Sequence, residues 1–507
     1  MREEMLRMER VTYKSQGETG LYNFSMTIWA GEILGLIPVN NYGLETLLLL
    51  LKQNLPLHYG YVYYHEKLIN DWKKPGSGMN RISIIQNKSC LAKDLTVADN
   101  IFVLRPGFKK WFMQPEVLKK QLIPFMEDIG ITISADAYVD ELTTFEKFVV
   151  ELLKAVVAGS RLIVLENIGT FISDDELVKL HEILRHYAQE GISFLYITSH
   201  HEEARQFCDR TAFMMNGQIT KYFEVGDRTP DTLFLPGVAD YDRWVRQQFE
   251  VQEEEGKSGA AFEIKSLYHG NLRNFSLRVE AGECLVIQDL DNGALKDLFS
   301  LLEGETQRSG QLLIDGEAVR PGKDRRLAVI QELPTETMIF HNMSYLDNLC
   351  FNMDHRFKRI WFAKGVKKSV AGEYGALLGE DVFYQKVEDL TQQQKYDLVY
   401  TRILLQNPRI VFCVQPFKQA EVSIRSHIWE LLERFLKKGI AVVILAVNLA
   451  DSLALADRLV RVKYGSVQEI YNKEDFIKLP VDTPWLYLYK EKYALEMEKQ
   501  REKAKEK

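Results

Sequence analysis

The sequence predicts an α/β fold made of two tandem domains, each with a mixed sheet core and a helical middle part. Two observations predict it. The chain of 507 residues repeats its own pattern, and within each copy short apolar runs alternate with helix-like segments. Such alternation is typical of a buried parallel sheet covered by helices. A chain of this length also exceeds what one hydrophobic core usually holds.

The internal repeat sets the domain boundaries, because self-similarity at a fixed offset indicates a duplicated unit. Residues 21–25 and 30–34 recur at 272–276 and 281–285. Five later pairs share one further offset: Asp99-Asn100 with Asp347-Asn348, Leu142-Thr143 with Leu390-Thr391, Gly191 with Gly439, Asp209-Arg210 with Asp457-Arg458, and Gly217 with Gly465. We therefore predict a first domain at 1–225, a linker at 226–259, a second domain at 260–478 and a charged, helical tail at 479–507.

The elements follow from these apolar runs. In the first copy we expect strands at 24–28, 33–37, 162–165 and 192–197, and a helix at 46–51. In the second copy the corresponding strands are at 275–279, 284–288, 410–413 and 441–445, and the helix is at 298–302. In such a domain the loop that joins the first buried strand to the next helix is where phosphate groups bind.

That loop, residues 35–46, has the position of a phosphate-binding loop but not its chemistry. A G-x-x-x-x-G-K-[ST] loop needs small residues, a lysine for the outer phosphates and a hydroxyl for Mg²⁺. Leu44 stands where the lysine belongs and Glu45 where the hydroxyl belongs, while Pro38 removes one backbone N–H group. In the second copy Leu295 stands at the lysine position, and Lys296 is followed by Asp297. An anionic side chain there would oppose phosphate binding.

Composition narrows the class of protein. The net charge of −7 gives no support for nucleic acid as a partner. No apolar run approaches the ~18 residues of a membrane span, and the charged first ten residues show no secretory signal. Five scattered cysteines without metal-ligand spacing are typical of reduced thiols. We therefore expect a cytoplasmic protein.

Several motifs resemble those of the ATP-binding cassette (ABC) ATPases, and in particular the tandem subunits of ribose, galactose and xylose importers. The stretch 95–102 resembles the segment after the Q-loop, with Gln86 as the Q-loop glutamine, and 196–200 resembles the switch-histidine loop. The resemblance implies a P-loop-like core with a helical subdomain, and ATP and Mg²⁺ as cofactors. The positions it assigns to nucleotide contact are Asn40, Gly43, Leu44, Glu45, Thr46, Gln86, Gly293, Lys296 and Gln331.

The catalytic positions that the resemblance implies are altered in both copies. In the family one strand ends in Asp-Glu, and the glutamate polarises the attacking water. This chain has Glu166-Asn167 in the first copy and Val414-Gln415 in the second. An amide cannot take up the proton that a general base must accept. His200 stands at the switch position and Asn448 at its counterpart. We therefore expect no catalytic residue. We also expect no metal site, and Glu166 is the one residue among these positions that could hold Mg²⁺.

Two functions remain open. One is a pseudo-ATPase of the carbohydrate-importer type that contacts a membrane permease or a membrane-bound regulator through its surface. The other is an ATP-binding, weakly hydrolysing energy-coupling subunit of a sugar importer. In both, the resemblance implies that the two cassettes pair head to tail as an intramolecular pseudo-dimer, and that the protein is peripheral at the inner face of the cell membrane. The partner, the sugar and the role of the tail stay open.

Overall fold

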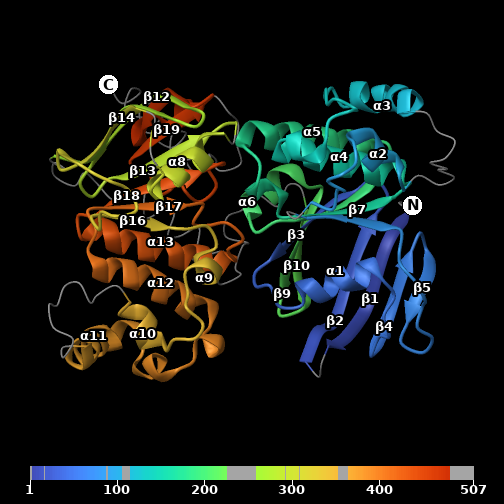
Figure 1. Ribbon diagram of the computed structural model, residues 1–507. Helices are drawn as coiled ribbons and strands as arrows, with labels where there is room; N and C mark the ends of the chain where they lie inside the picture. The colour runs from blue at the N-terminus through green and yellow to red at the C-terminus, as the bar shows by residue number, and fades with distance from the viewer. Residues whose placement is uncertain are drawn as a thin grey trace, which may run out of the picture. The chain divides into compact units, whose positions relative to one another are not determined.

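The computed structural model describes residues 3–15, 18–86, 89–104, 115–224, 259–291, 293–305, 307, 309–351 and 363–479. The chain divides into two compact units, Met1–Leu235 and Pro236–Lys507 (Figure 1). The expected linker and tail lie outside the described residues, apart from Gly259 and Leu479. Within the described part of the chain, no helix is long and apolar enough to cross a membrane.

A six-stranded sheet forms the centre of the first unit. Its order is β6-β7-β8-β3-β9-β10. The strands are β6 (Ile82–Ile85), β7 (Leu162–Glu166), β8 (Ser193–Ile197), β3 (Ile33–Pro38), β9 (Arg210–Met215) and β10 (Gln218–Glu224). All neighbours are parallel except the last pair. β3 is buried along its whole length, as expected for a strand covered on both faces.

A second, antiparallel sheet of order β2-β1-β4-β5 completes the first core. Its strands are β1 (Glu4–Ser15), β2 (Glu18–Trp29), β4 (Tyr59–Tyr64) and β5 (Lys67–Asp71). Helix α1 (Leu44–Lys52) shares one apolar cluster with both sheets, to which Phe24, Leu36 and Leu47 contribute. Figure 1 shows this helix against the strands of the antiparallel sheet. Only β2 of this sheet was predicted from the sequence.

The helices of the first unit lie between the strands of the parallel sheet in the sequence. They are α2 (Val97–Phe102), α3 (Pro115–Asp128), α4 (Thr144–Val157), α5 (Asp174–Gln189) and α6 (His201–Phe207). Helix α2 packs against α3 and α4. Helix α4 begins where the Thr143 hydroxyl accepts the Glu146 N–H and the Glu146 carboxylate accepts the Thr143 N–H. This reciprocal cap satisfies two backbone donors.

The second unit repeats this arrangement. Its six-stranded sheet has the order β16-β17-β18-β13-β19-β20 and its antiparallel sheet the order β12-β11-β14-β15. The strands of the first are β16 (Leu327–Ile330), β17 (Ile410–Val414), β18 (Ala441–Ala446), β13 (Cys284–Asp289), β19 (Arg458–Lys463) and β20 (Ser466–Asn472). Those of the second are β12 (Leu272–Glu280), β11 (Ala260–His269), β14 (Ser309–Ile314) and β15 (Glu317–Ala318). The expected α/β fold with two repeated mixed-sheet domains is confirmed.

The helices of the second unit are α8 (Ala294–Leu302), α9 (Pro334–Thr337), α10 (Tyr345–Leu349), α11 (Ala363–Leu378), α12 (Gln392–Gln406) and α13 (Val422–Lys437). Helices α1 and α8 start two and four residues earlier than the apolar runs predicted, at Leu44 and Ala294. Exposed Glu45 and Lys296 lie in their first turns. Polar residues on the outer face of a first turn break an apolar run without ending the helix.

The repeated sequence motifs form the same contacts in both units. The Asp209 and Asp457 carboxylates each accept a backbone N–H, from Ile33 and Cys284, at 2.8 Å. Arg210 pairs with Glu32, and Arg458 pairs with Glu283. Buried Asn100 and Asn348 each bind both backbone groups of one residue eight positions earlier. The aspartate and arginine contacts therefore hold the start of the central strand and the turn before it, and the asparagines hold the loops that precede α2 and α10.

Candidate functional site

The first phosphate-loop position, between β3 and α1, has its backbone groups engaged within the protein. The Val39 N–H donates to the Met214 carbonyl at 2.9 Å, and the Leu44 N–H donates to the Asn41 carbonyl at 3.1 Å. Pro38 ends β3 and has no N–H group. A loop that binds phosphate needs such N–H groups to point at the ligand. Two of the loop's donors are therefore bound to carbonyls of the chain itself.

The side chains of this loop pack against neighbouring turns. Leu44 is 4% exposed and belongs to the apolar core, whereas Glu45 is exposed. Gly43 has φ +83°, and a Cβ there would lie 2.2 Å from the Gly20 carbonyl oxygen. This glycine is thus required by packing alone.

The two polar candidates of this loop also face the protein. The Asn40 amide is bound in both directions: its Nδ2 donates to Asn216 Oδ1 at 2.8 Å and its Oδ1 accepts the Asn216 N–H at 3.1 Å. Thr46 faces Gly20 near the start of β2, because a Cβ on Gly20 would meet its hydroxyl oxygen at 2.3 Å. Neither side chain is directed into an open phosphate site.

In the second unit a carboxylate of the chain itself occupies the corresponding loop. Asp289, the last residue of β13, is fully buried. Its Oδ2 accepts the N–H groups of Ala294 at 2.8 Å and Leu295 at 2.9 Å. Those are the first two residues of α8, and free N–H groups at a helix start are the usual binding site of an anion. Asp289 therefore takes the place that a phosphate oxygen would need.

Two acidic neighbours complete this second loop. The pKa of Asp289 is raised to about 6, mainly by burial and also by the adjacent Asp291 carboxyl, while the two N–H bonds oppose the increase. Oδ1 of Asp289 and Oδ1 of Asp291 are both buried without a hydrogen-bond partner among the described residues. Asp297 accepts the Asn271 N–H at 2.6 Å. Gly293 caps α8 and its carbonyl accepts Asn271 Nδ2, while Lys296 is exposed.

At the strand ends of the first unit, the structure brings two candidates together. Gln86, after β6, donates its amide N–H to the Glu166 carboxylate at the end of β7. Asn167 follows in the left-handed region at φ 50°, and its buried Oδ1 has no hydrogen-bond partner among the described residues. His200 is 2% exposed and precedes α6. Its neighbour Glu203 is fully buried.

Glu203 anchors a polar cluster behind this strand end. Its carboxylate accepts the hydroxyls of Tyr196 and Thr198, and His181 lies 3.3 Å from it. Burial raises the pKa of Glu203, but these partners outweigh burial and lower it overall. The cluster therefore holds a negative charge at neutral pH within the protein.

The second unit arranges its strand ends differently. Gln331 donates to Glu303 at 3.0 Å rather than to a residue at the end of β17. The link between the ends of β16 and β17 is an ion pair of Glu332 with Lys418. Gln415 has φ 43° and donates its N–H to Leu445. Asn448 Oδ1 accepts the Ala450 N–H at 3.2 Å.

Metal-ligating side chains are few at these positions. Glu166 is a carboxylate at the expected Mg²⁺ position, and it binds Gln86. Elsewhere in the described part of the chain, Asp128, His186 and Glu190 place their ligand atoms within 4.8 Å of one another. Two of the three are exposed, and exposed carboxylates commonly occur in such groups without an ion. They lie at α3 and the end of α5, away from the loop of β3.

The sequence alone assigned no role to Asp289. The signal was present, because Asp289 aligns with Pro38, one of the positions where backbone must approach a phosphate. Without the structure, nothing in the sequence told whether its carboxylate turns toward the start of the helix or toward solvent.

Two units with this sheet order, each with a loop from the central strand into a helix, have the fold expected of tandem ABC-type cassettes. Over 93% of its length the chain is 22% identical to the ribose import ATP-binding protein RbsA of Clostridium tetani, covering 95% of that protein. It is 23% identical to RbsA of Clostridium perfringens strain SM101, over 95% of this chain and 99% of that one. The resemblance to tandem cassette subunits of sugar importers is confirmed.

Three further comparisons were made with known proteins. The chain is 24% identical, over 78% of its length and 76% of the relative's, to a putative ribose/galactose/methyl galactoside import ATP-binding protein of Burkholderia lata. A solved ATP-binding cassette of an ABC transporter in its ADP conformation matches 47% of this chain and 97% of its own, at 20% identity and a TM-score of 0.41. No protein-family model matches the chain.

Proposed function

We propose that this chain is a degenerate ATP-binding cassette protein of the carbohydrate-importer type that has lost ATP hydrolysis. It would act as a structural or regulatory partner of a membrane permease or sensor. The carrying observation is the Asp289 carboxylate, which is bound to the N–H groups of Ala294 and Leu295. A triphosphate would have to displace this internal anion.

Charge makes that displacement unfavourable. Two like charges ~4 Å apart repel by on the order of 4 kcal/mol at an effective dielectric of 20, which corresponds to nearly a thousandfold in affinity. The second loop carries Asp289 and Asp291, both beside the start of α8. In the first loop Leu44 is packed into the core, so no cation faces the phosphates.

The chemistry of hydrolysis is also incomplete. Phosphoryl transfer depends on positioning and on neutralising charge, so each missing group acts on the barrier directly. Asn167 and Gln415 stand where a carboxylate would orient the attacking water. Their left-handed backbone keeps the shape of the strand end, while the amide side chains cannot accept a proton.

The alternative is an ATP-binding, weakly hydrolysing energy-coupling subunit of a sugar importer. Two observations favour it: the similarity to ribose import ATP-binding proteins along nearly the whole chain, and the preserved contact between Gln86 and Glu166. In that case ATP and Mg²⁺ would be bound cofactors, with Glu166 the candidate for holding the ion. The partner is a permease or a sensor in the proposed function and a permease in the alternative. Both functions place the protein at the inner face of the membrane with its cassettes paired head to tail.

Calorimetric titration of the purified full chain with ATP and Mg²⁺ tests the proposal. We expect no heat of binding and no release of phosphate. Steady hydrolysis that Asn167→Ala and Gln415→Ala abolish would overturn it, because a contaminating ATPase would not respond to these substitutions. Competitive binding of a labelled ATP analogue in the micromolar range, together with stimulation by a permease, would support the alternative.

A further inference from the structure

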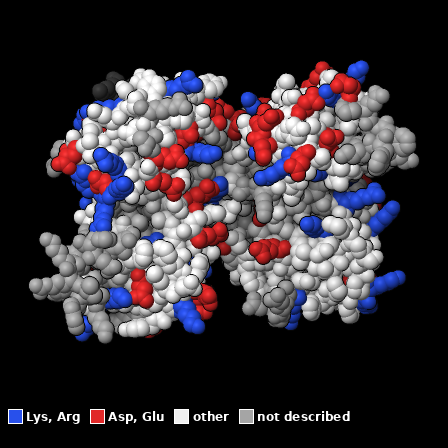
Figure 2. Space-filling view, viewed as in Figure 1, with Lys and Arg blue, Asp and Glu red and all other residues white. Residues whose placement is uncertain are grey.

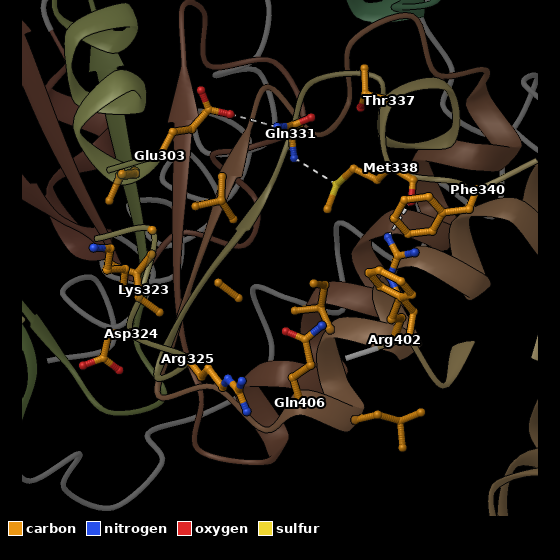
Figure 3. A pocket seen from close by; sticks show the side chains of 18 residues that line it. Glu303, Lys323, Asp324, Arg325, Gln331, Thr337, Met338, Phe340, Arg402 and Gln406 are labelled. Atoms are coloured by element: carbon orange, nitrogen blue, oxygen red, sulfur yellow. Dashed lines mark hydrogen bonds between the residues drawn. The ribbon is translucent and has the colours of Figure 1, made fainter. Parts of the chain in front are cut away.

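The second unit contains a pocket of about 630 Å³, and of its lining only Gln331 belongs to the positions assigned to nucleotide contact. It is bounded by the end of α8, the segment that leads into β16, the segment around α9 and the last turns of α12. Figure 3 shows Arg402 and Phe340 on one side of the hollow and Lys323 and Arg325 on the other. A volume of this size is typical of sites for small molecules.

Arg402 is the unusual member of the lining. It is 4% exposed, and its Nη2 donates to the Met338 carbonyl at 2.6 Å. Its Nη1 is buried without a hydrogen-bond partner among the described residues. Burial lowers the pKa of Arg402 to about 10, and no carboxylate counteracts that effect. The guanidinium is therefore still charged at neutral pH, although buried charges are normally paired.

The two copies differ in the residue one turn before this cation. The repeat aligns Arg402 in α12 with Lys154 in α4, and Val399 with Glu151. In the first unit burial raises the pKa of the Glu151 carboxyl, and the charge of Lys154 opposes this. Val399 is fully buried in the second unit. Both copies therefore have a cation at this position, whereas the position one turn earlier is a carboxylate in the first copy and an apolar side chain in the second.

The remaining charges of the pocket leave a positive excess. Asp324 is paired with Arg326 at 2.9 Å, and Glu303 accepts an amide N–H from Gln331. Lys323 and Arg325 are exposed and make no ion pair with the described residues. An anion entering the pocket would thus meet the three cations Lys323, Arg325 and Arg402. Of the two lining carboxylates, Asp324 is already neutralised by its ion pair.

An aromatic pair lies beside the buried guanidinium. Phe340 and Phe351 are 41% and 36% exposed, and their ring centroids lie 4.4 Å apart. The Phe340 ring centroid lies 5.6 Å from the guanidinium carbon of Arg402. An exposed ring over a buried charge can turn on its side-chain bonds and open Nη1 to a ligand. The same rings offer an apolar surface to the body of that ligand.

From these contacts we propose that the pocket beside Arg402 binds a small organic anion, a carboxylate or phosphate ester carried on an apolar or aromatic body. The anionic group would pair with Arg402, with Lys323 and Arg325 at the opposite wall, and the body would lie on Phe340 and Phe351. The proposal does not depend on the loss of ATP hydrolysis, since the pocket uses neither phosphate-loop segment.

Ligand-observed NMR with phenyl phosphate, phenylacetate and inorganic phosphate tests the site. We expect phenyl phosphate and phenylacetate to bind the full chain with dissociation constants in the low millimolar range, which is typical of molecules of this size in a complementary site. Inorganic phosphate, which lacks the apolar body, should bind more weakly. Benzyl alcohol, which lacks the anion, should not bind measurably.

Arg402→Met should weaken phenyl phosphate binding by at least about tenfold, because charge-assisted hydrogen bonds are among the strong ones. Arg402→Lys should retain part of it. Arg273→Gln removes an exposed cation of the same unit and should leave binding unchanged. If a substitution at Arg402 disturbs folding, phenyl phosphate should still raise the thermal midpoint of the unmodified chain, and this readout stands alone.

Equal affinity of Arg402→Met and the unmodified chain, or no binding of either aromatic anion to the unmodified chain, would overturn the proposal. Binding of an acidic peptide without binding of the small anions would also overturn it, in favour of a protein partner. If the small anions do not bind, the result expected from calorimetry with ATP is unaffected. ATP binding that Arg402→Met abolishes would support this site, because ATP is itself a phosphate ester with an aromatic body, and would contradict only the expected absence of heat with ATP.

Discussion

Asp289→Asn should stabilise the second unit at neutral and alkaline pH. An asparagine is similar in shape to a protonated aspartic acid: its oxygen still accepts the Ala294 and Leu295 N–H groups, and its NH₂ group can donate to Asp291. The unmodified carboxyl has a pKa of about 6 against an ordinary value of 3.8. A raised pKa in the folded state means that the group's contribution to stability is present below pH 3.8 and is lost as pH rises through about 6.

The magnitude follows from that shift. A difference of about two pH units corresponds to roughly 3 kcal/mol between the protonated and ionised forms. We therefore expect Asp289→Asn to be up to roughly 3 kcal/mol more stable than the unmodified chain at pH 8. Near pH 4 the two should be equally stable, because both then carry a neutral side chain at this position.

Because the chain has two compact units, a local readout is preferable to global unfolding. Hydrogen exchange of a peptide that contains the Ala294 and Leu295 amides reports on this loop directly. After correction for the intrinsic rate, protection at pH 8 should rise by up to about a hundredfold in the variant. Asp315→Asn, which removes an exposed carboxylate of the same unit, serves as the matched control. Lower protection in Asp289→Asn, or a difference that does not change with pH, would refute the reasoning.

Three further predictions concern other parts of the chain. Leu44→Lys with Glu45→Ser should give partial ATP binding without turnover, because Asn167 remains. The double variant should also lose about 3 kcal/mol of stability in denaturant titration, since Leu44 is a core residue. Recovered turnover would show the argument wrong. Gly43→Ala should lower stability by more than Gly159→Ala, since both have positive φ but only Gly43 meets backbone, and an equal loss would contradict this. Arg425→Met should cost about 3–5 kcal/mol by stranding buried Asp451, whereas Arg409→Gln at an exposed pair should cost under about 1 kcal/mol.

The fold was largely predictable because its signals are local and repeated. The buried strands β3, β7, β13 and β17 are continuous apolar runs, and the duplication gave each landmark twice. The antiparallel sheets were harder to predict. Their strands are partly exposed, as in β4 and β5, so the apolar pattern is weak, and pairing β1 with β4 joins segments far apart in the sequence.

The candidate site was predictable in position but not in chemistry. The resemblance assigned Gln86 to nucleotide contact and Glu166 to Mg²⁺ in separate motifs, and the structure brings the two side chains together. Sequence reasoning saw Gly43 as a remnant of phosphate binding, whereas its contact with Gly20 is a packing requirement. It also could not give the direction of the Asp289 side chain, which depends on two N–H groups five and six residues later.

The two loops differ from a phosphate site by different physical means. In the first, an apolar side chain at Leu44 enters the core and stabilises the helix start through burial. In the second, the Asp289 carboxyl accepts the N–H groups of the helix start. A helix start without a bound phosphate has unsatisfied N–H groups, which are costly when buried. In each loop, groups of the protein itself offset this cost. A single substitution that restores a lysine therefore removes a stabilising contact before it gains a ligand, so ATP binding and folding stability should change in opposite directions in such variants.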